Sequence, residues 1–210
     1  MKNLIDLFKL AEVTRDQPQY DYNLAGVHRS ELSDLAQHQY LVTFIAWQLA
    51  TSIQQAGAEL NVQRVMEISM IHDFGELFGS DISFYYAKAN PTARKLAKEF
   101  EHENNNFLSR FFPEPSEYQK LVEEMEAQAT NESIVAKIAD YTEVLLNKHR
   151  MGKLLPQDIE SNGAVLTSIA QRSNDQIIQT ILVDFVNSWK DALPGKSVLD
   201  IIEDSHTHNA

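Results

Sequence analysis

The sequence predicts an all-α protein that folds as a compact helical bundle. The 210 residues include only 7 glycines and 6 prolines, and the apolar residues recur at helical spacing rather than in the strict alternation of strands. Hydrophobic residues make up 43% of the chain, which is enough to bury a sizeable core. No composition break or repeat divides the chain, so we expect residues 1–204 to form a single domain and residues 205–210 to form a disordered tail.

Two helices and a long polar connection are expected near the N-terminus. The first helix covers residues 3–13, and the polar segment 14–33 is an extended loop, long enough to be functional. The second helix covers residues 34–56. Its expected apolar stripe consists of Leu41, Ile45, Leu49 and Ile53. His38 precedes this stripe by one turn, so its side chain should point inward.

A third helix is expected to begin after Asn61, a residue type that caps helices well. Its inward face should carry Val62, Val65, Met66 and Ser69, and helical spacing places His72, Asp73 and Glu76 on the same side. Three polar side chains therefore fall on a face that is expected to be buried.

Five further helices are expected downstream. They cover residues 91–110, 117–127, 132–151, 163–172 and 175–192. The last has an expected stripe of Ile177, Ile181, Phe185 and Trp189. Asp140, on the 132–151 helix, lies one turn from Ala136 and Val144, and is thus a second carboxylate among apolar neighbours.

Charge and composition exclude several classes of protein. The 30 acidic and 18 basic residues give a net charge of −12, which opposes binding to nucleic acid polymers and anionic membranes. The absence of cysteine excludes disulfides, thiol catalysis and thiolate zinc sites. Neither a run of 18 uncharged apolar residues nor a signal peptide is visible. We therefore expect a cytoplasmic protein without a membrane span.

Four side chains are candidates for a metal site, because ionised carboxylates and histidines on buried faces are costly unless they pair or coordinate. They are His38, His72, Asp73 and Asp140. Taken singly, His38 is more often a core histidine, a His-Asp pair is weak evidence, and Asp140 could pair with a lysine. Together, two imidazoles and two carboxylates suit one divalent cation: Mn²⁺, Co²⁺, Fe²⁺, Ni²⁺ or Mg²⁺.

The order of these residues resembles the HD-domain metal-dependent phosphohydrolases, and within them the bacterial and archaeal 5'-deoxynucleotidases. The resemblance rests on three stretches, AQHQY at 36–40, IHDFGELFGSD at 71–81 and KIAD at 137–140, and it spans about the first three quarters of the chain. It implies an HD-domain bundle, to which the region after Met151 would add extra C-terminal helices that match no motif. It also implies that His38, His72, Asp73 and Asp140 hold one cation.

The resemblance further implies a function. Glu76 would be the proton-transfer residue, Asp81 would contact water or the sugar, and Arg15 would bind phosphate, although a surface arginine at a helix end remains an alternative for Arg15. The expected substrates are (deoxy)nucleoside 5'-monophosphates, attacked by metal-activated water. Two alternatives stay open, namely hydrolysis of nucleoside triphosphates or alarmones, and a non-catalytic module that binds nucleotide or metal. Relatives are often dimers, so a homodimer is also expected.

Overall fold

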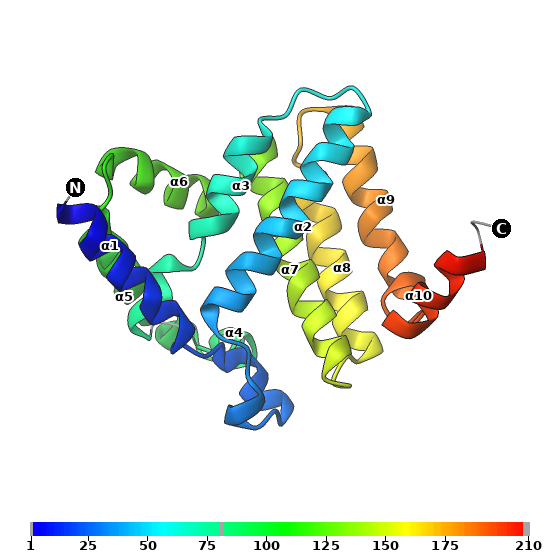
Figure 1. The fold of residues 1–210 in the computed structure, drawn as a ribbon, viewed down its shortest axis with the longest axis horizontal. Helices are drawn as coiled ribbons and strands as arrows, with labels where there is room; N and C mark the ends of the chain where they lie inside the picture. The colour runs from blue at the N-terminus through cyan, green and yellow to red at the C-terminus, as the bar shows by residue number, and fades with distance from the viewer. Residues whose placement is uncertain (1, 80–81, 208–210) are drawn as a thin grey trace.

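The computed structural model describes residues 2–79 and 82–207, and within this part it contains helices, turns and one isolated β-bridge between Pro18 and Asp34, with no strand. The all-α prediction is therefore confirmed. Its α-helices are α1 (Lys2–Glu12), α2 (Leu35–Gln55), α3 (Val62–Ile71), α4 (Phe84–Ala89), α5 (Pro91–Ser109), α6 (Pro115–Ala127), α7 (Asn131–Arg150), α8 (Pro156–Ala170), α9 (Gln176–Ala192) and α10 (Val198–Thr207) (Figure 1). None of these helices is both long and apolar enough to cross a membrane.

Side-chain caps explain where several helices begin. The carboxylate of Asp34 accepts a hydrogen bond from the backbone N–H of Gln37 at the start of α2, and Asn61 does the same for Arg64 at the start of α3. Asp175 caps α9 in this way too. These bonds satisfy N–H groups that have no partner inside the helix. The predicted starts of these three helices are therefore confirmed to within one residue.

Other boundaries differ from the prediction. The polar segment 14–33 is not a simple loop, because it contains three short 3₁₀ helices: η1 (Val13–Arg15), η2 (Tyr20–Ala25) and η3 (Arg29–Glu31). Helix α4 was not predicted. Pro115 and Pro156 are each the first residue of a helix, α6 and α8, because proline needs no N–H partner there. Helix α8 thus starts well before the predicted residue 163.

The C-terminal end also differs from the prediction. Helix α10 continues to Thr207, so residues 205–207 of the expected disordered tail are helical. The remaining tail residues, 208–210, lie outside the described part of the chain.

Three apolar clusters form the interior of the described part of the chain. The largest is formed by α2, α3, α7, α8 and α9, and a second by α1, α5, α6 and the 3₁₀ helix η4 (Phe74–Phe78). A small third cluster joins α3, α6 and α7 through Ile68, Leu121, Met125 and Ala136. Figure 1 shows α2 and α7 in the middle, with α8 and α9 on one side and α1, α5 and α6 on the other. The segment that joins α3 to η4 therefore lies where the two halves of the molecule meet.

The predicted apolar stripes are partly wrong. Leu41 in α2 is 43% exposed and Ile177 in α9 is 40% exposed. The buried positions are Leu35, His38, Gln39, Val42, Thr43, Ala46, Ala50 and Ile53 in α2, and Ile178, Leu182, Val186 and Trp189 in α9. Apolar residues occur around much of α2, so periodicity alone does not decide which face packs. Contact with α3 and α7 decides it, through the small side chains of Ala46 and Ala50.

Candidate metal centre

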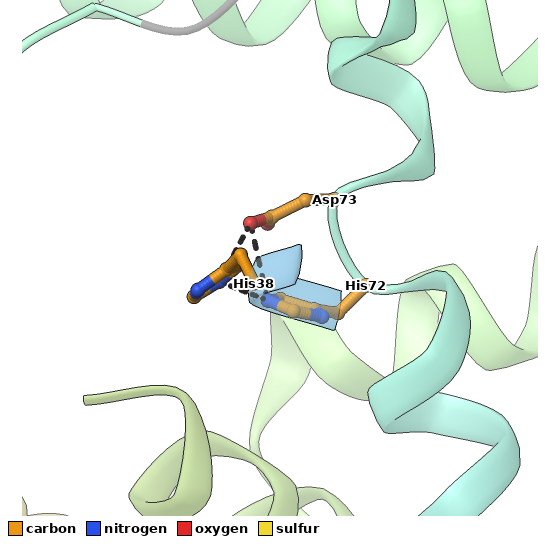
Figure 2. Close-up of side chains that lie close together, drawn as sticks. All are labelled: His38, His72 and Asp73. Atoms are coloured by element: carbon orange, nitrogen blue, oxygen red, sulfur yellow. Dashed lines mark hydrogen bonds and ion pairs between the residues drawn. The ribbon is translucent and has the colours of Figure 1, made fainter. Parts of the chain in front are cut away.

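The described residues contain a compact group of possible metal ligands on α2 and at the end of α3. His38, on α2, His72, at the C-terminal cap of α3, and Asp73 offer one atom each within 4.8 Å of one another (Figure 2). The two Nε2 atoms lie 3.2 Å apart. Oδ2 of Asp73 lies 3.3 Å from Nε2 of His38 and 3.1 Å from Nε2 of His72. Three of the four predicted ligands therefore face a common point.

The fourth predicted ligand approaches from α7. Oδ1 of Asp140 lies 3.4 Å from Nε2 of His38 and 3.7 Å from Nε2 of His72. Its other oxygen, Oδ2, accepts a hydrogen bond of 2.8 Å from the ammonium group of Lys137, one turn earlier. The lysine pairing considered from the sequence is thus present, and it leaves Oδ1 directed at the two imidazoles.

The outer nitrogens of both imidazoles are already used as donors. Nδ1 of His72 lies 2.8 Å from the backbone carbonyl oxygen of Ser69, which can only accept, so this nitrogen carries the hydrogen. Nδ1 of His38 likewise donates to Oε2 of Glu143 at 2.6 Å. Assigned in this way, both neutral imidazoles present a bare lone pair on Nε2.

Two imidazole lone pairs and two carboxylate oxygens thus point at one another with no donor between them. Such an arrangement needs a positive charge, either a proton or a cation. Ligand atoms about 2.1 Å from one cation lie roughly 3.0–3.4 Å from each other, close to the separations found here. The residues present therefore fit a single divalent cation, and the fit rests on four donors that come from α2, the end of α3 and α7.

The electrostatics of the group agree with this chemistry. Burial alone would lower the pKa of His72, but the charge of Asp73 and hydrogen bonds to Asp140 and Asp73 outweigh it and raise that pKa to about 9. Burial also lowers the pKa of His38, but its hydrogen bonds to Asp140, Asp73 and Glu143 outweigh this and raise that pKa. Burial raises the pKa of Asp73, yet the two histidines, His72 foremost, lower it well below its usual range. The site therefore attracts positive charge strongly.

Glu143 is a site residue that the sequence interpretation missed. Its carboxylate is 4% exposed and holds His38, so it fixes the tautomer that directs Nε2 inward. Lys137, Asp140 and Glu143 lie three residues apart and share one face of α7. The spacing in the sequence predicts that these three residues lie on one face of the helix. It does not predict which side chains on other helices they contact.

Glu76 is placed differently from the prediction. Helix α3 ends at Ile71, and Glu76 lies on η4, with its backbone N–H bonded to the carbonyl of Asp73 at 2.9 Å. It is therefore not one α-helical turn beyond His72 on the same helix face. The change of direction after α3 is a property of the Asp73 backbone, whose φ of −107° and ψ of 15° leave the α-helical region.

The turn that carries Glu76 is held from α5 and α6. The side-chain amide of Asn104 donates to the carbonyl of Gly75 at 2.8 Å, and the hydroxyl of Tyr118 donates to Oδ1 of Asn105 at 2.5 Å. A Cβ at Gly75 would lie only 2.5 Å from Nδ2 of Asn105. A side chain at position 75 would therefore have to displace the Asn105 amide, which favours glycine there.

A buried carboxylate on α5 was also missed. Glu101 is 7% exposed and pairs with the ammonium group of Lys98 at 2.6 Å. Burial raises the pKa of Glu101, Lys98 opposes this, and the negative charge of Asp73 raises it further. Helix α5 thus contributes a buried carboxylate, Glu101, whose negative charge is paired with Lys98.

Of the two predicted substrate residues, only Arg15 lies in the described part of the chain, and its ion pair is with a residue outside this group. The guanidinium of Arg15 pairs with Glu12 at 3.2 Å on the surface, where the two side chains are 70% and 67% exposed. Asp81 lies outside the described residues. The roles predicted for these two residues therefore stay predictions.

An all-α fold with two histidines and two aspartates around one point defines a class of metal-binding helical protein, and comparison with known families makes it more specific. Residues 23–182 match the HD-domain family. The chain belongs to the HD-domain family. No curated protein matches it. The predicted recognition of an HD domain is thus confirmed, and the 5'-deoxynucleotidase branch stays a prediction.

Solved structures share the fold. An HD-domain phosphohydrolase from Listeria innocua is 22% identical, with 97% of both chains covered and a TM-score of 0.64. A predicted metal-dependent phosphohydrolase from Magnetospirillum magnetotacticum is 18% identical, with 89% of this chain and 92% of that chain covered and a TM-score of 0.63. A conserved hypothetical protein from Pyrococcus furiosus is 26% identical, with 88% and 97% covered and a TM-score of 0.59. The similarity extends over nearly the whole of each chain.

Proposed function

We propose that this protein is a metal-dependent phosphohydrolase that releases phosphate from (deoxy)nucleoside 5'-monophosphates. One observation carries the proposal: four ligand atoms converge while both outer imidazole nitrogens are occupied as donors. Membership of the HD-domain family and the likeness to proteins described as phosphohydrolases support it. The choice of monophosphates rests on the resemblance of residues 71–81 to the 5'-deoxynucleotidases.

Each residue of the site has a separate role in the proposed reaction. His38, His72, Asp73 and Asp140 would hold the cation, and Glu143 and Lys137 keep two of these ligands oriented. When bound, a divalent cation would activate water and neutralise charge on the phosphoryl oxygens. Glu76 would accept and return the proton, a contribution of about 10²–10⁴ in rate.

Substrate would approach on the side of Asp73. The side chain of Asp73 is 23% exposed, compared with 12% for Asp140 and 1% for each histidine. Glu76 follows Asp73 on η4 and is partly exposed, so it lies on the same open segment of the chain. Arg15 would bind the phosphate if the segment that carries it turns toward the site with substrate.

The test is phosphate release from a panel of nucleoside mono-, di- and triphosphates. Protein stripped with chelator and reloaded with Mn²⁺, Co²⁺ or Mg²⁺ should release phosphate from monophosphates, and Asp73→Ala should abolish this activity. Arg15→Ala should raise KM for the monophosphate, with Arg29→Ala as a matched surface control. A preference for triphosphates would contradict the assignment of monophosphates as substrates. Metal binding without hydrolysis of any nucleotide would contradict the proposal that the protein is an enzyme.

A further inference from the structure

Lys98, on α5, is a cation beside the candidate metal centre that has no role in the reaction proposed above. Its side chain is 58% exposed, and its ammonium group lies 2.6 Å from Oε2 of Glu101. We propose that Lys98 binds the phosphate group of the substrate from the α5 side of the centre. This role rests on the proposed phosphohydrolase function, to which it adds a substrate-binding residue.

Helix α5 places Lys98 near the turn that follows Asp73. The side-chain amide of Asn104 donates to the backbone carbonyl of Gly75 on η4 at 2.8 Å. Positions 98, 101 and 104 are three residues apart, so they follow one face of the helix. Lys98 therefore extends the same face that holds η4, about 9 Å further along the helix axis at 1.5 Å per residue.

The charge of Asp73 acts on both members of the pair that Lys98 forms with Glu101. Burial lowers the pKa of Lys98, the carboxylates of Glu101 and Glu126 raise it, and the charge of Asp73 raises it further. The pKa of Glu101, which burial raises, is also raised by Asp73. Interactions between charges weaken with distance, so Lys98 and Glu101 lie near the most exposed of the four candidate ligands.

The ammonium group keeps donors for a ligand while it stays in place. A lysine has three N–H donors, and among the residues that the structure describes Glu101 accepts one of them at 2.6 Å. The nearest oxygen of Glu126 is 4.0 Å away, which is beyond hydrogen-bonding distance. Glu101 is 7% exposed and therefore a fixed anchor. The remaining N–H groups can donate to phosphate oxygens without breaking this pair.

Two other cations considered for the site are less well placed to bind phosphate. Lys137 is 23% exposed and is paired at 2.8 Å with Asp140, itself a candidate metal ligand. Arg15 is paired with Glu12 on the surface and would have to turn toward the site. A phosphate monoester carries a charge of about −1.5 to −2 at pH 7, and the chain carries −12. A cation that already lies near Asp73 offsets this repulsion locally.

Binding of inorganic phosphate to the Mn²⁺-loaded full chain tests the proposal without requiring turnover. Calorimetric titration should give a dissociation constant about 10–100-fold higher for Lys98→Gln than for wild type, because a charge-assisted hydrogen bond is lost. Lys98→Arg keeps the charge and should retain most of the affinity. Lys95→Gln is the matched control: Lys95 lies on the same helix, pairs with Glu99 at 3.6 Å, and should be replaceable without loss of phosphate binding.

The outcomes separate this proposal from the proposed function. Phosphate affinity that is unchanged in Lys98→Gln, or that falls equally in Lys95→Gln, would overturn the role of Lys98 even if the protein is an active hydrolase. Wild type that binds Mn²⁺ but no phosphate would overturn it too. Mn²⁺ affinity should be the same in Lys98→Gln as in wild type. Loss of phosphate binding in Lys98→Gln supports the role of Lys98 even if no nucleotide is hydrolysed.

A second pair of variants protects the test against an effect on folding. Lys98→Gln alone leaves the buried carboxylate of Glu101 without its partner, which is destabilising. Glu101→Gln combined with Lys98→Gln removes both charges, and should bind phosphate about 10–100-fold more weakly than Glu101→Gln alone. Equal affinity in these two variants would show that Lys98 serves only to neutralise Glu101, and would overturn the proposal.

Discussion

The two sides of the candidate metal centre are built from different kinds of backbone. On one side α7 runs without interruption from Asn131 to Arg150 and presents Lys137, Asp140 and Glu143 from one face. On the other side the helix stops: α3 ends at Ile71, and the chain turns at Asp73 into η4. Both sides contribute one carboxylate ligand.

The two sides also support their ligands in different ways. The α7 side uses charged side chains, since Lys137 holds Asp140 and Glu143 holds His38. The α3–η4 side uses backbone carbonyls, because His72 donates to Ser69 and the carbonyl of Gly75 is held from α5. The α7 side is therefore held by charged side chains and is more buried. The α3–η4 side is more exposed, which suits it to contact substrate.

The largest difference should appear when each carboxylate is removed. Asp140→Ala leaves the Lys137 ammonium without its partner, which should cost about 3–5 kcal/mol of unfolding free energy. Asp73→Ala should cost less, because Asp73 is more exposed. Both should abolish cation binding. Urea denaturation in chelator measures the stabilities.

A rescue variant sharpens that comparison. Lys137→Met combined with Asp140→Ala should recover much of the lost stability, since no unpaired ammonium remains. Equal losses of unfolding free energy in Asp140→Ala and Asp73→Ala would contradict the proposed difference between the α7 side and the α3–η4 side.

The pH dependence of cation binding should follow the histidines. The pKa of His72 is raised to about 9 and that of His38 is raised as well, so the cation must displace at least one proton, and its apparent affinity should fall at least tenfold for each pH unit below 9. The stability of the cation-free protein should change with pH in the opposite direction. The proton on His72 stabilises the fold fully below pH 6.5, the pKa of histidine in the unfolded chain, and this stabilisation is lost as pH rises through about 9.

Thermal unfolding with and without cation between pH 7 and pH 9 checks both statements. The stabilisation conferred by the cation should grow with pH, while the cation-free protein should weaken over the same range. An affinity that stays flat over this range would show that the imidazoles hold no proton in the cation-free state.

Removing the charge behind His38 should weaken the cation site without unfolding the protein. Glu143→Gln keeps an acceptor for Nδ1 but removes the negative charge, and we expect cation affinity to fall about 10–100-fold. Calorimetric titration measures this loss. Glu160→Gln, an exposed change on α8, is the control and should bind as wild type does.

The smallest change in stability is expected from a substitution in the turn that carries Glu76. Gly75→Ala places a Cβ 2.5 Å from the Asn105 amide, which should cost about 1 kcal/mol of stability and lower kcat by moving Glu76. Gly163→Ala on α8 is the control, because its Cβ would meet only Val186 at 3.8 Å and should stabilise the helix. Equal stability and kcat in the two variants would contradict a role for the close approach.

Much of this architecture was predictable from local signals. Asp34, Asn61 and Asp175 cap helices, and a short polar side chain at a helix start acts within three residues of itself. The four ligand candidates were likewise identified because histidine and aspartate stood out among apolar neighbours. Glu143 was missed because it looks like any helical glutamate until His38, 105 residues away, is brought beside it.

The order of residues by itself determined the helical class, most helix starts and the set of donors that suits a divalent cation, because these depend on side-chain chemistry and on short-range periodicity. Only the tertiary structure decided that α3 stops before Asp73, that the inner face of α2 carries Ala46 and Ala50 and leaves Leu41 exposed, and that Lys137 and Glu143 contact the candidate ligands. Those outcomes depend on which helices pack together, and packing joins residues whose separation along the chain carries no local signal.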